Sequence, residues 1–136
     1  MPGDPELTER YRAAVEAGDL AALATLYHDD ALLDAHVPNW RFQLAGRDEV
    51  ARFTGCGLPA PGRFTSFVAE PTVDGDLLLQ LEWRQHADDG PGAQSRQVHV
   101  LRLDDGRIRA QTVFCAGVWG PELQRRMATE APLLQP

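Results

Sequence analysis

Apolar positions recur at helical spacing through residues 5–17 and predict an amphipathic helix. Asp4 is suited to cap this helix, with Pro5 at the first helical position, where a missing N–H breaks no intrahelical hydrogen bond. Gly18 is expected to end the helix and Asp19 to cap the next one. The apolar face of the first helix consists of Leu7, Tyr11, Ala14 and Val15.

A second helix, a pair of strands and a third helix are expected next. The second helix is predicted to end at Asp29-Asp30, where two consecutive aspartates interrupt the apolar pattern. Its apolar face would consist of Leu20, Leu23, Leu26 and Tyr27. The elements expected after it are a strand Ala31–Val37, a turn at Pro38-Asn39, a strand Trp40–Leu44, a helix Arg47–Thr54 closed by Gly55, and a loop Cys56–Arg63.

The rest of the chain alternates with period two and predicts an antiparallel meander. In Leu77–His86, the apolar face carries Leu77, Leu79, Leu81 and Trp83, and the opposite face carries Glu82, Arg84 and His86. The other expected elements are strands Phe64–Ala69, Gln94–Leu103 and Arg107–Val118, a hairpin turn at Asp104-Asp105-Gly106, a helix Pro121–Thr129 and a loose tail over residues 130–136. Helices followed by a meander predict an α+β fold, with a curved sheet wrapped over the helices as a cone with a single pocket.

Composition narrows the possible partners. A length of 136 residues predicts a single domain over residues 1–136. The net charge of −7 argues against a nucleic acid or an anionic membrane surface as partner. The acidic, polar N-terminus does not resemble a signal peptide, and no apolar run approaches the roughly 20 residues of a membrane span. We therefore expect a cytoplasmic protein.

Several chemistries lack their residues. All 13 positive side chains are arginine, so no Schiff-base lysine exists. Cys56 and Cys115 form no Cys-x-x-Cys motif, and the four histidines show neither His-x-His nor His-Glu-x-x-His spacing. We therefore expect no metal and no cofactor.

Three segments resemble the nuclear-transport-factor-2-like superfamily. These are RYRAAVEAGDLAALATLYHDDALLDA, AGRDEVARF and VLRLDDGRIRAQTVF, and the resemblance spans Glu6 to Trp119. This superfamily includes ketosteroid isomerases, SnoaL-like cyclases and limonene epoxide hydrolases, which share a cone fold. The resemblance implies a ligand pocket inside the cone, a small hydrophobic ligand with a carbonyl or hydroxyl group, and a homodimer formed through the outer face of the sheet.

The closest resemblance is to bacterial ketosteroid isomerases. It places their catalytic phenol at Tyr11 and the second tyrosine of their hydrogen-bonded network at Tyr27. Their third tyrosine corresponds to Thr54, and their oxyanion-holding acid corresponds to His99. Their general-base aspartate corresponds to Ala35, which cannot accept a proton.

Asp34 and His36 are the candidate replacements for that base. They lie two positions apart on the predicted strand, so an aspartate could orient a histidine there. Adjacent strand residues face opposite sides, so Asp34 reaches the side of Ala35 only if a bulge near Pro38-Asn39 redirects it.

Three functions remain open from the sequence. The first is a cofactor-free isomerase, cyclase or lyase, in which Tyr11 and His99 stabilise an oxyanion while Asp34 or His36 moves the proton. The second is a non-catalytic ligand-binding or accessory protein. The third is an epoxide hydrolase with Arg102 and Asp104, although strand alternation directs Arg102 away from the face of His99. The expected ligand-binding residues are Tyr27, Trp40, Phe53, Thr54, Leu79, Leu81, Trp83, Gln111, Val113 and Cys115.

Overall fold

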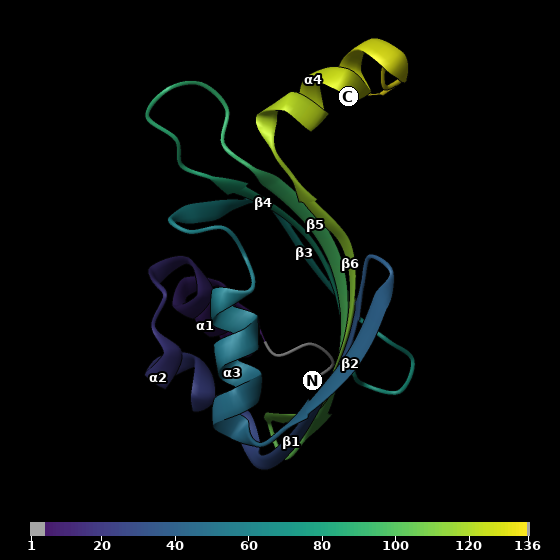
Figure 1. Ribbon diagram of the computed structural model, residues 1–136. Coiled ribbons are helices and arrows are strands. Elements are labelled where there is room, and N and C mark those ends of the chain that lie inside the picture. The colour runs from purple at the N-terminus through teal and green to yellow at the C-terminus, as the bar shows by residue number, and fades with distance from the viewer. Residues whose placement is uncertain (1–4, 136) are drawn as a thin grey trace.

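The computed structural model describes residues 5–135, in which a six-stranded sheet curves around three helices (Figure 1). A fourth helix, α4, projects from the far end of the sheet (Figure 1). The predicted cap residue Asp4 lies outside the described residues. The elements are α1 (Pro5–Ala17), α2 (Leu20–Ala24), β1 (Tyr27–Val37), β2 (Trp40–Ala45), α3 (Arg47–Cys56), β3 (Gly62–Pro71), β4 (Leu77–Gln85), β5 (Gln94–Asp104), β6 (Arg107–Trp119) and α4 (Pro121–Glu130).

The strand order is β2-β1-β6-β5-β4-β3. Strand β1 pairs with β6 in parallel, and every other neighbouring pair is antiparallel. The predicted turn between β5 and β6 is present, with positive φ angles of 52° at Asp105 and 76° at Gly106. Two consecutive positive φ values are the geometry that joins antiparallel strands through a two-residue turn. This α+β architecture is the predicted cone fold.

The second helix is shorter than predicted. It ends at Ala24, and its cap is the expected one, with the Asp19 carboxylate accepting a hydrogen bond from the N–H of Ala22 at 3.0 Å. Tyr27 already belongs to β1 and pairs with Ile108, whose N–H donates to the carbonyl of Leu26 at 2.8 Å. Pairing with β6 therefore overrides the local helical pattern, and Asp29-Asp30 lies within the strand instead of ending a helix.

The core lies between the helices and the face of the sheet that they cover, which we call the inner face. The predicted apolar face of β4 is buried there, with Leu79 fully enclosed and Trp83 2% exposed. The Trp83 indole donates to the carbonyl of Pro59 at 2.7 Å. No helix among the described residues covers the opposite, outer face of the sheet (Figure 1), which carries both polar and apolar side chains.

Candidate functional site

A chain of hydrogen-bonded side chains runs through the core. Its central members are Tyr11 on α1, Tyr27 on β1, His99 on β5 and Gln111 on β6, none more than 3% exposed. The parallel pairing of β1 with β6 and the antiparallel pairing of β5 with β6 bring three of these side chains together on the inner face. Helix α1 supplies Tyr11 from above that face. The four residues thus come from segments far apart in the sequence.

Gln111 is the centre of this chain. Its Oε1 accepts a hydrogen bond from the Tyr27 hydroxyl at 2.5 Å. Its Nε2 donates to the Tyr11 hydroxyl oxygen at 3.2 Å and to Nδ1 of His99 at 2.7 Å. Thr54, the residue that corresponds to the third tyrosine, lies 3.2 Å from the Tyr27 hydroxyl. The structure therefore joins Tyr11, Tyr27, Thr54 and His99 through a residue that we had expected only to line the pocket.

His99 is held neutral. Its Nδ1 accepts from Gln111, and its Nε2 lies 2.7 Å from Oε1 of Gln97, an arrangement that requires a proton on Nε2. Burial lowers the pKa of His99 to about 3, because a charged imidazolium would lack solvation there. Both ring nitrogens are occupied, so the imidazole has no free lone pair to serve as a base.

Gln97 extends the chain to Cys115 at the partly exposed end of the core. The Gln97 amide donates to the Cys115 sulfur at 3.5 Å, and the N–H of Gly117 donates to the same sulfur at 3.3 Å. The Ser95 hydroxyl lies 3.7 Å from this sulfur. Gln97 is not among the site residues predicted from the sequence, and its strand parity with His99 is the one signal that could have identified it.

Tyr11 uses its hydroxyl oxygen but not its hydroxyl hydrogen. The oxygen accepts from Gln111, and no acceptor within residues 5–135 takes the hydrogen. Burial raises the pKa of Tyr11, so the phenol keeps its proton at any physiological pH. The ring of Phe67 packs over it with centroids 6.2 Å apart, and the ring of His99 lies edge-on at 6.4 Å.

The interior carries no charge. Within residues 5–135, no Asp, Glu or Arg side chain is buried, and the buried titratable groups are the phenols of Tyr11 and Tyr27 and the imidazole of His99. Burial also raises the pKa of Tyr27. A charged ligand would therefore meet no counter-charge in this interior.

Asp34 and His36 lie on the outer face, which corrects their expected place in the site. The Asp34 carboxylate accepts two hydrogen bonds from Arg41, both 2.9 Å long, and lies 3.4 Å from Nε2 of His36. The His36 ring stacks on Phe114 with centroids 4.6 Å apart. Strand β1 keeps its alternation through Leu33, so no bulge turns these side chains inward. They do not meet Tyr11.

Tyr27, Thr54 and Gln111 belong to the hydrogen-bonded chain, and the other expected ligand-binding residues divide into three groups. Leu79, Leu81, Trp83 and Val113 are core residues of the inner face. Phe53 and Cys115 are partly exposed at the edge of the core, and Phe53 packs against Phe42 with ring centroids 5.3 Å apart. Trp40, however, is 70% exposed, because it is the first residue of β2 and lies beside the turn that joins β1 and β2, where it pairs with Val37. It does not line an interior site.

The residues of the epoxide hydrolase alternative also lie away from the interior. Arg102 is exposed on the outer face of β5, as strand alternation predicted. Asp104 is exposed at the end of the same strand, where its carbonyl lies 2.6 Å from Nε2 of His28. Neither the Asp104 carboxylate nor the Arg102 guanidinium reaches Tyr11.

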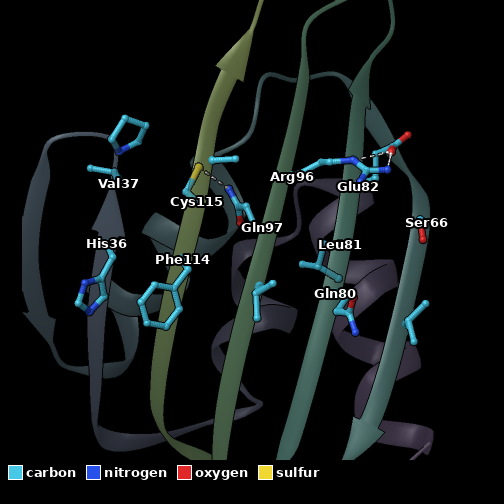
Figure 2. Close-up of a pocket in the computed structure, with 14 residues that line it drawn as sticks. His36, Val37, Ser66, Gln80, Leu81, Glu82, Arg96, Gln97, Phe114 and Cys115 are labelled. Carbon is cyan, nitrogen blue, oxygen red and sulfur yellow. Dashed lines mark hydrogen bonds and ion pairs between the residues drawn. The ribbon is translucent and has the colours of Figure 1, made fainter. Parts of the chain in front are cut away.

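A groove of about 560 Å³ lies on the outer face (Figure 2). Figure 2 shows His36 and Phe114 at one side of it and the Arg96–Glu82 ion pair at the other. Apolar side chains such as Val98 lie between these sides. The sequence predicted one pocket, around Tyr11; instead this open groove lies on the other face, and Tyr11 is enclosed. The described residues include no cluster of three or more His, Cys, Asp or Glu side chains able to hold a metal ion, and no helix among them is long and apolar enough to span a membrane.

Comparisons with known proteins agree with this architecture. Among curated proteins, none matches the sequence. A protein from Catenulispora acidiphila with a ketosteroid isomerase-like fold, solved with trimethylamine, is 17% identical, with 84% of this chain and 88% of that chain covered and a TM-score of 0.66. An NTF2-like protein from Mesorhizobium loti is 22% identical, with 86% and 98% covered and a TM-score of 0.65.

A third structure has an enzymatic description. It is a putative polyketide cyclase from Pseudomonas putida, 22% identical, with 80% of this chain and 88% of that chain covered and a TM-score of 0.60. At these identities the structures show a shared fold and not a shared activity. The family model of the SnoaL-like domain matches residues 8–111, which include every member of the hydrogen-bonded chain except Cys115. This chain therefore belongs to the SnoaL-like domain family and shares its fold with NTF2-like and ketosteroid isomerase-like proteins.

Proposed function

We propose that the protein binds a small, neutral, hydrophobic molecule whose acceptor oxygen, such as a carbonyl, receives a hydrogen bond from Tyr11. The observation that carries the proposal is the unused hydroxyl hydrogen of Tyr11 inside an uncharged core. A buried donor without an acceptor is costly, and a carbonyl oxygen would satisfy it. The surrounding apolar side chains would bury the rest of the ligand.

Access to Tyr11 requires side-chain movement. Tyr11 is 1% exposed, and Phe67 packs over it. Phe67, Phe42 and Phe53 are only partly buried, so rotation of the Phe67 ring towards solvent would open space beside Tyr11 for a ligand to fill. The ligand would replace Phe67 as the group packed against Tyr11.

A cofactor-free isomerase, cyclase or lyase is the second candidate. It is favoured by the same Tyr11 donor, which would stabilise an oxyanion forming on a substrate carbonyl. Such a reaction also needs a group that moves a proton. Asp34 and His36 face the other side of the sheet, and both nitrogens of His99 are occupied. The geometry therefore supports binding better than proton transfer.

Two probes of equal shape test this proposal. Acetylnaphthalene carries a carbonyl, and isopropenylnaphthalene replaces the carbonyl oxygen with a CH₂ group. We expect wild-type protein to bind the carbonyl probe more tightly than the alkene probe. Tyr11→Phe should weaken the affinity for the carbonyl probe by about three- to tenfold, which corresponds to the loss of one neutral hydrogen bond. Affinity for the alkene probe should stay within about twofold. Trp40→Phe, at an exposed position, is the control. Equal losses for both probes, or none, would contradict the role of Tyr11.

We also infer that a second copy of this chain covers the outer face. Large apolar side chains exposed there are Leu32, Val68, Val98 and Phe114. An ion pair lies towards each side of the face, Asp34–Arg41 and Glu82–Arg96. A twofold axis along the central strands would place the Asp34–Arg41 pair of one copy opposite the Glu82–Arg96 pair of the other, so that opposite charges can meet.

Sedimentation velocity tests this inference. Wild-type protein should sediment as a dimer, and Phe114→Glu should convert it to a monomer, because it places a charge in the apolar part of the face. The control Leu133→Glu changes an exposed residue near the C-terminus and should leave the dimer intact. A wild-type monomer at high micromolar concentration would contradict the inference.

A further inference from the structure

We infer that Gln111 is a positioning residue whose amide sets the direction of the hydrogen bonds that run from Thr54 to Cys115, so that Tyr11 presents its hydrogen, and not a lone pair, to a ligand. The ligand at Tyr11 rests on the proposed function. The direction of the hydrogen bonds between the buried side chains does not. It adds a ligand specificity to that function, because a Tyr11 hydroxyl held in this way favours ligands that offer an acceptor over ligands that offer an N–H.

The first step is the orientation of the Gln111 amide. Its oxygen faces the Tyr27 hydroxyl at 2.5 Å, and its nitrogen faces two groups, the Tyr11 oxygen and Nδ1 of His99. An amide nitrogen carries two hydrogens, so each of the two groups receives one. Tyr27 must donate to Gln111, and Tyr11 and His99 must accept from it.

The second step is that both ends of the chain agree with this direction. Since the Tyr27 hydrogen goes to Gln111, the hydroxyl of Thr54, 3.2 Å away, must donate to the Tyr27 oxygen. At the other end, His99 donates through Nε2 to Oε1 of Gln97, and the Gln97 amide donates to Cys115. Hydrogen bonds therefore run in one direction from Thr54 to Cys115.

Reversing the direction of these hydrogen bonds requires several groups to change at once. If the Gln111 amide alone turned over, its oxygen would face the unprotonated Nδ1 of His99, and its N–H groups would face the hydrogen of Tyr27. Reversal thus requires the amides of Gln111 and Gln97 and the proton of His99 to change together in a buried site. Such a coupled network holds one arrangement more firmly than any single bond does.

The ligand class follows from this direction. Gln111 already occupies the Tyr11 oxygen, so the phenol offers an incoming group a hydrogen. Ketones, aldehydes and ethers accept that hydrogen, whereas an amine or amide N–H would meet a second N–H beside it. The neutral His99, fully engaged, adds no compensating acceptor.

Nitrogen NMR of the imidazole ring tests the direction without any ligand. In wild-type protein, His99 should show a protonated Nε2 and an unprotonated Nδ1. Gln111→Glu replaces the donating NH₂ with an oxygen of nearly the same shape, which only accepts hydrogen bonds once the carboxyl is ionised, so the spectra are recorded at a pH above the pKa of this buried carboxyl. His99 should then carry a proton on Nδ1, and Tyr11 should donate to the new carboxyl group. The preference for acetylnaphthalene over isopropenylnaphthalene should consequently disappear. Gln43→Glu adds the same charge on an exposed strand position and should change neither readout.

The outcomes separate the two proposals. A wild-type His99 protonated on Nδ1, or an unchanged tautomer in Gln111→Glu, would overturn the positioning role. If Gln111→Glu does not fold, Gln111→Leu provides the comparison, and it should leave His99 as a mixture of tautomers because no donor fixes Nδ1. If instead the tautomers behave as expected and wild-type protein shows no preference for the carbonyl probe, the proposed binding function fails and the positioning role stands.

Discussion

Asp34 and Ala35 face opposite sides of strand β1. Ala35, which the resemblance to ketosteroid isomerases aligns with their general base, is fully buried on the inner face, while Asp34 binds Arg41 on the outer face. One step along a strand reverses the direction of a side chain, so a carboxylate next in sequence to the expected position is distant from it in space. Among residues 5–135, the inner site consequently has hydrogen-bond donors but no buried carboxylate.

The Asp34–Arg41 pair predicts a stability contribution that is lost only in strong acid. Hydrogen bonds from Arg41 lower the pKa of Asp34 to about 2, below its ordinary value of 3.8. The contribution is therefore fully present above pH 3.8 and disappears as the pH falls through about 2. In urea unfolding, the difference between wild type and Asp34→Asn should be constant at neutral pH and shrink in that acidic range. Carbonyl-probe binding should be unchanged at neutral pH; a loss of binding would place Asp34 back in the site.

His99 predicts a loss of stability at milder acidity. Its pKa falls from 6.5 in the unfolded chain to about 3 in the folded protein, so below pH 6.5 the unfolded chain binds a proton that the folded protein does not. One proton changes the free energy of unfolding by about 1.4 kcal/mol per pH unit. Relative to His99→Gln, wild-type protein should lose stability at about this slope between pH 6 and pH 4. Parallel curves for the two proteins would exclude a buried neutral imidazole.

The Tyr27 hydroxyl predicts an energetic coupling to Thr54. Tyr27→Phe leaves Oε1 of Gln111 without its donor and should lower the free energy of unfolding by about 1–3 kcal/mol. Thr54→Val should cost about 1 kcal/mol alone and much less in the Tyr27→Phe background, because the partner oxygen is already gone. Chemical denaturation of the four proteins measures this cycle. Thr112→Val, on the outer face, is the control for the threonine substitution; strictly additive effects would contradict the contact.

The backbone at Gly62 leaves no room for a side chain beside Trp83. A Cβ at this position would lie 2.6 Å from the carbonyl oxygen of Arg84 and 2.6 Å from Nε1 of Trp83. Gly62→Ala should therefore destabilise the protein by about 1–3 kcal/mol and shift the Trp83 fluorescence, since the indole must leave its hydrogen bond to Pro59. Gly120→Ala, where a Cβ meets open space, should be nearly neutral. Equal stability of both variants would show that the strands separate easily here.

Local chemistry was sufficient to predict much of the scaffold. Gly18 has a φ of 68° and ends α1, and Asp19 caps α2, as their residue types predicted. The alternation in β4 correctly assigned Leu79 and Trp83 to the core. These features depend on the conformational preferences of a few neighbouring residues, which can be predicted from the residue types alone.

The chemistry of the interior was decided by tertiary structure. Tyr27 became a strand residue because β6 supplied a partner for its backbone. Gln111 became the centre of the site because strand register set its amide between the Tyr27 hydroxyl and the ring of His99. The sequence by itself determined which side chains share a face of each strand. Only the packing of β1, β5, β6 and α1 determined which of them touch, because hydrogen bonds between segments far apart depend on register and distance, which no local pattern encodes.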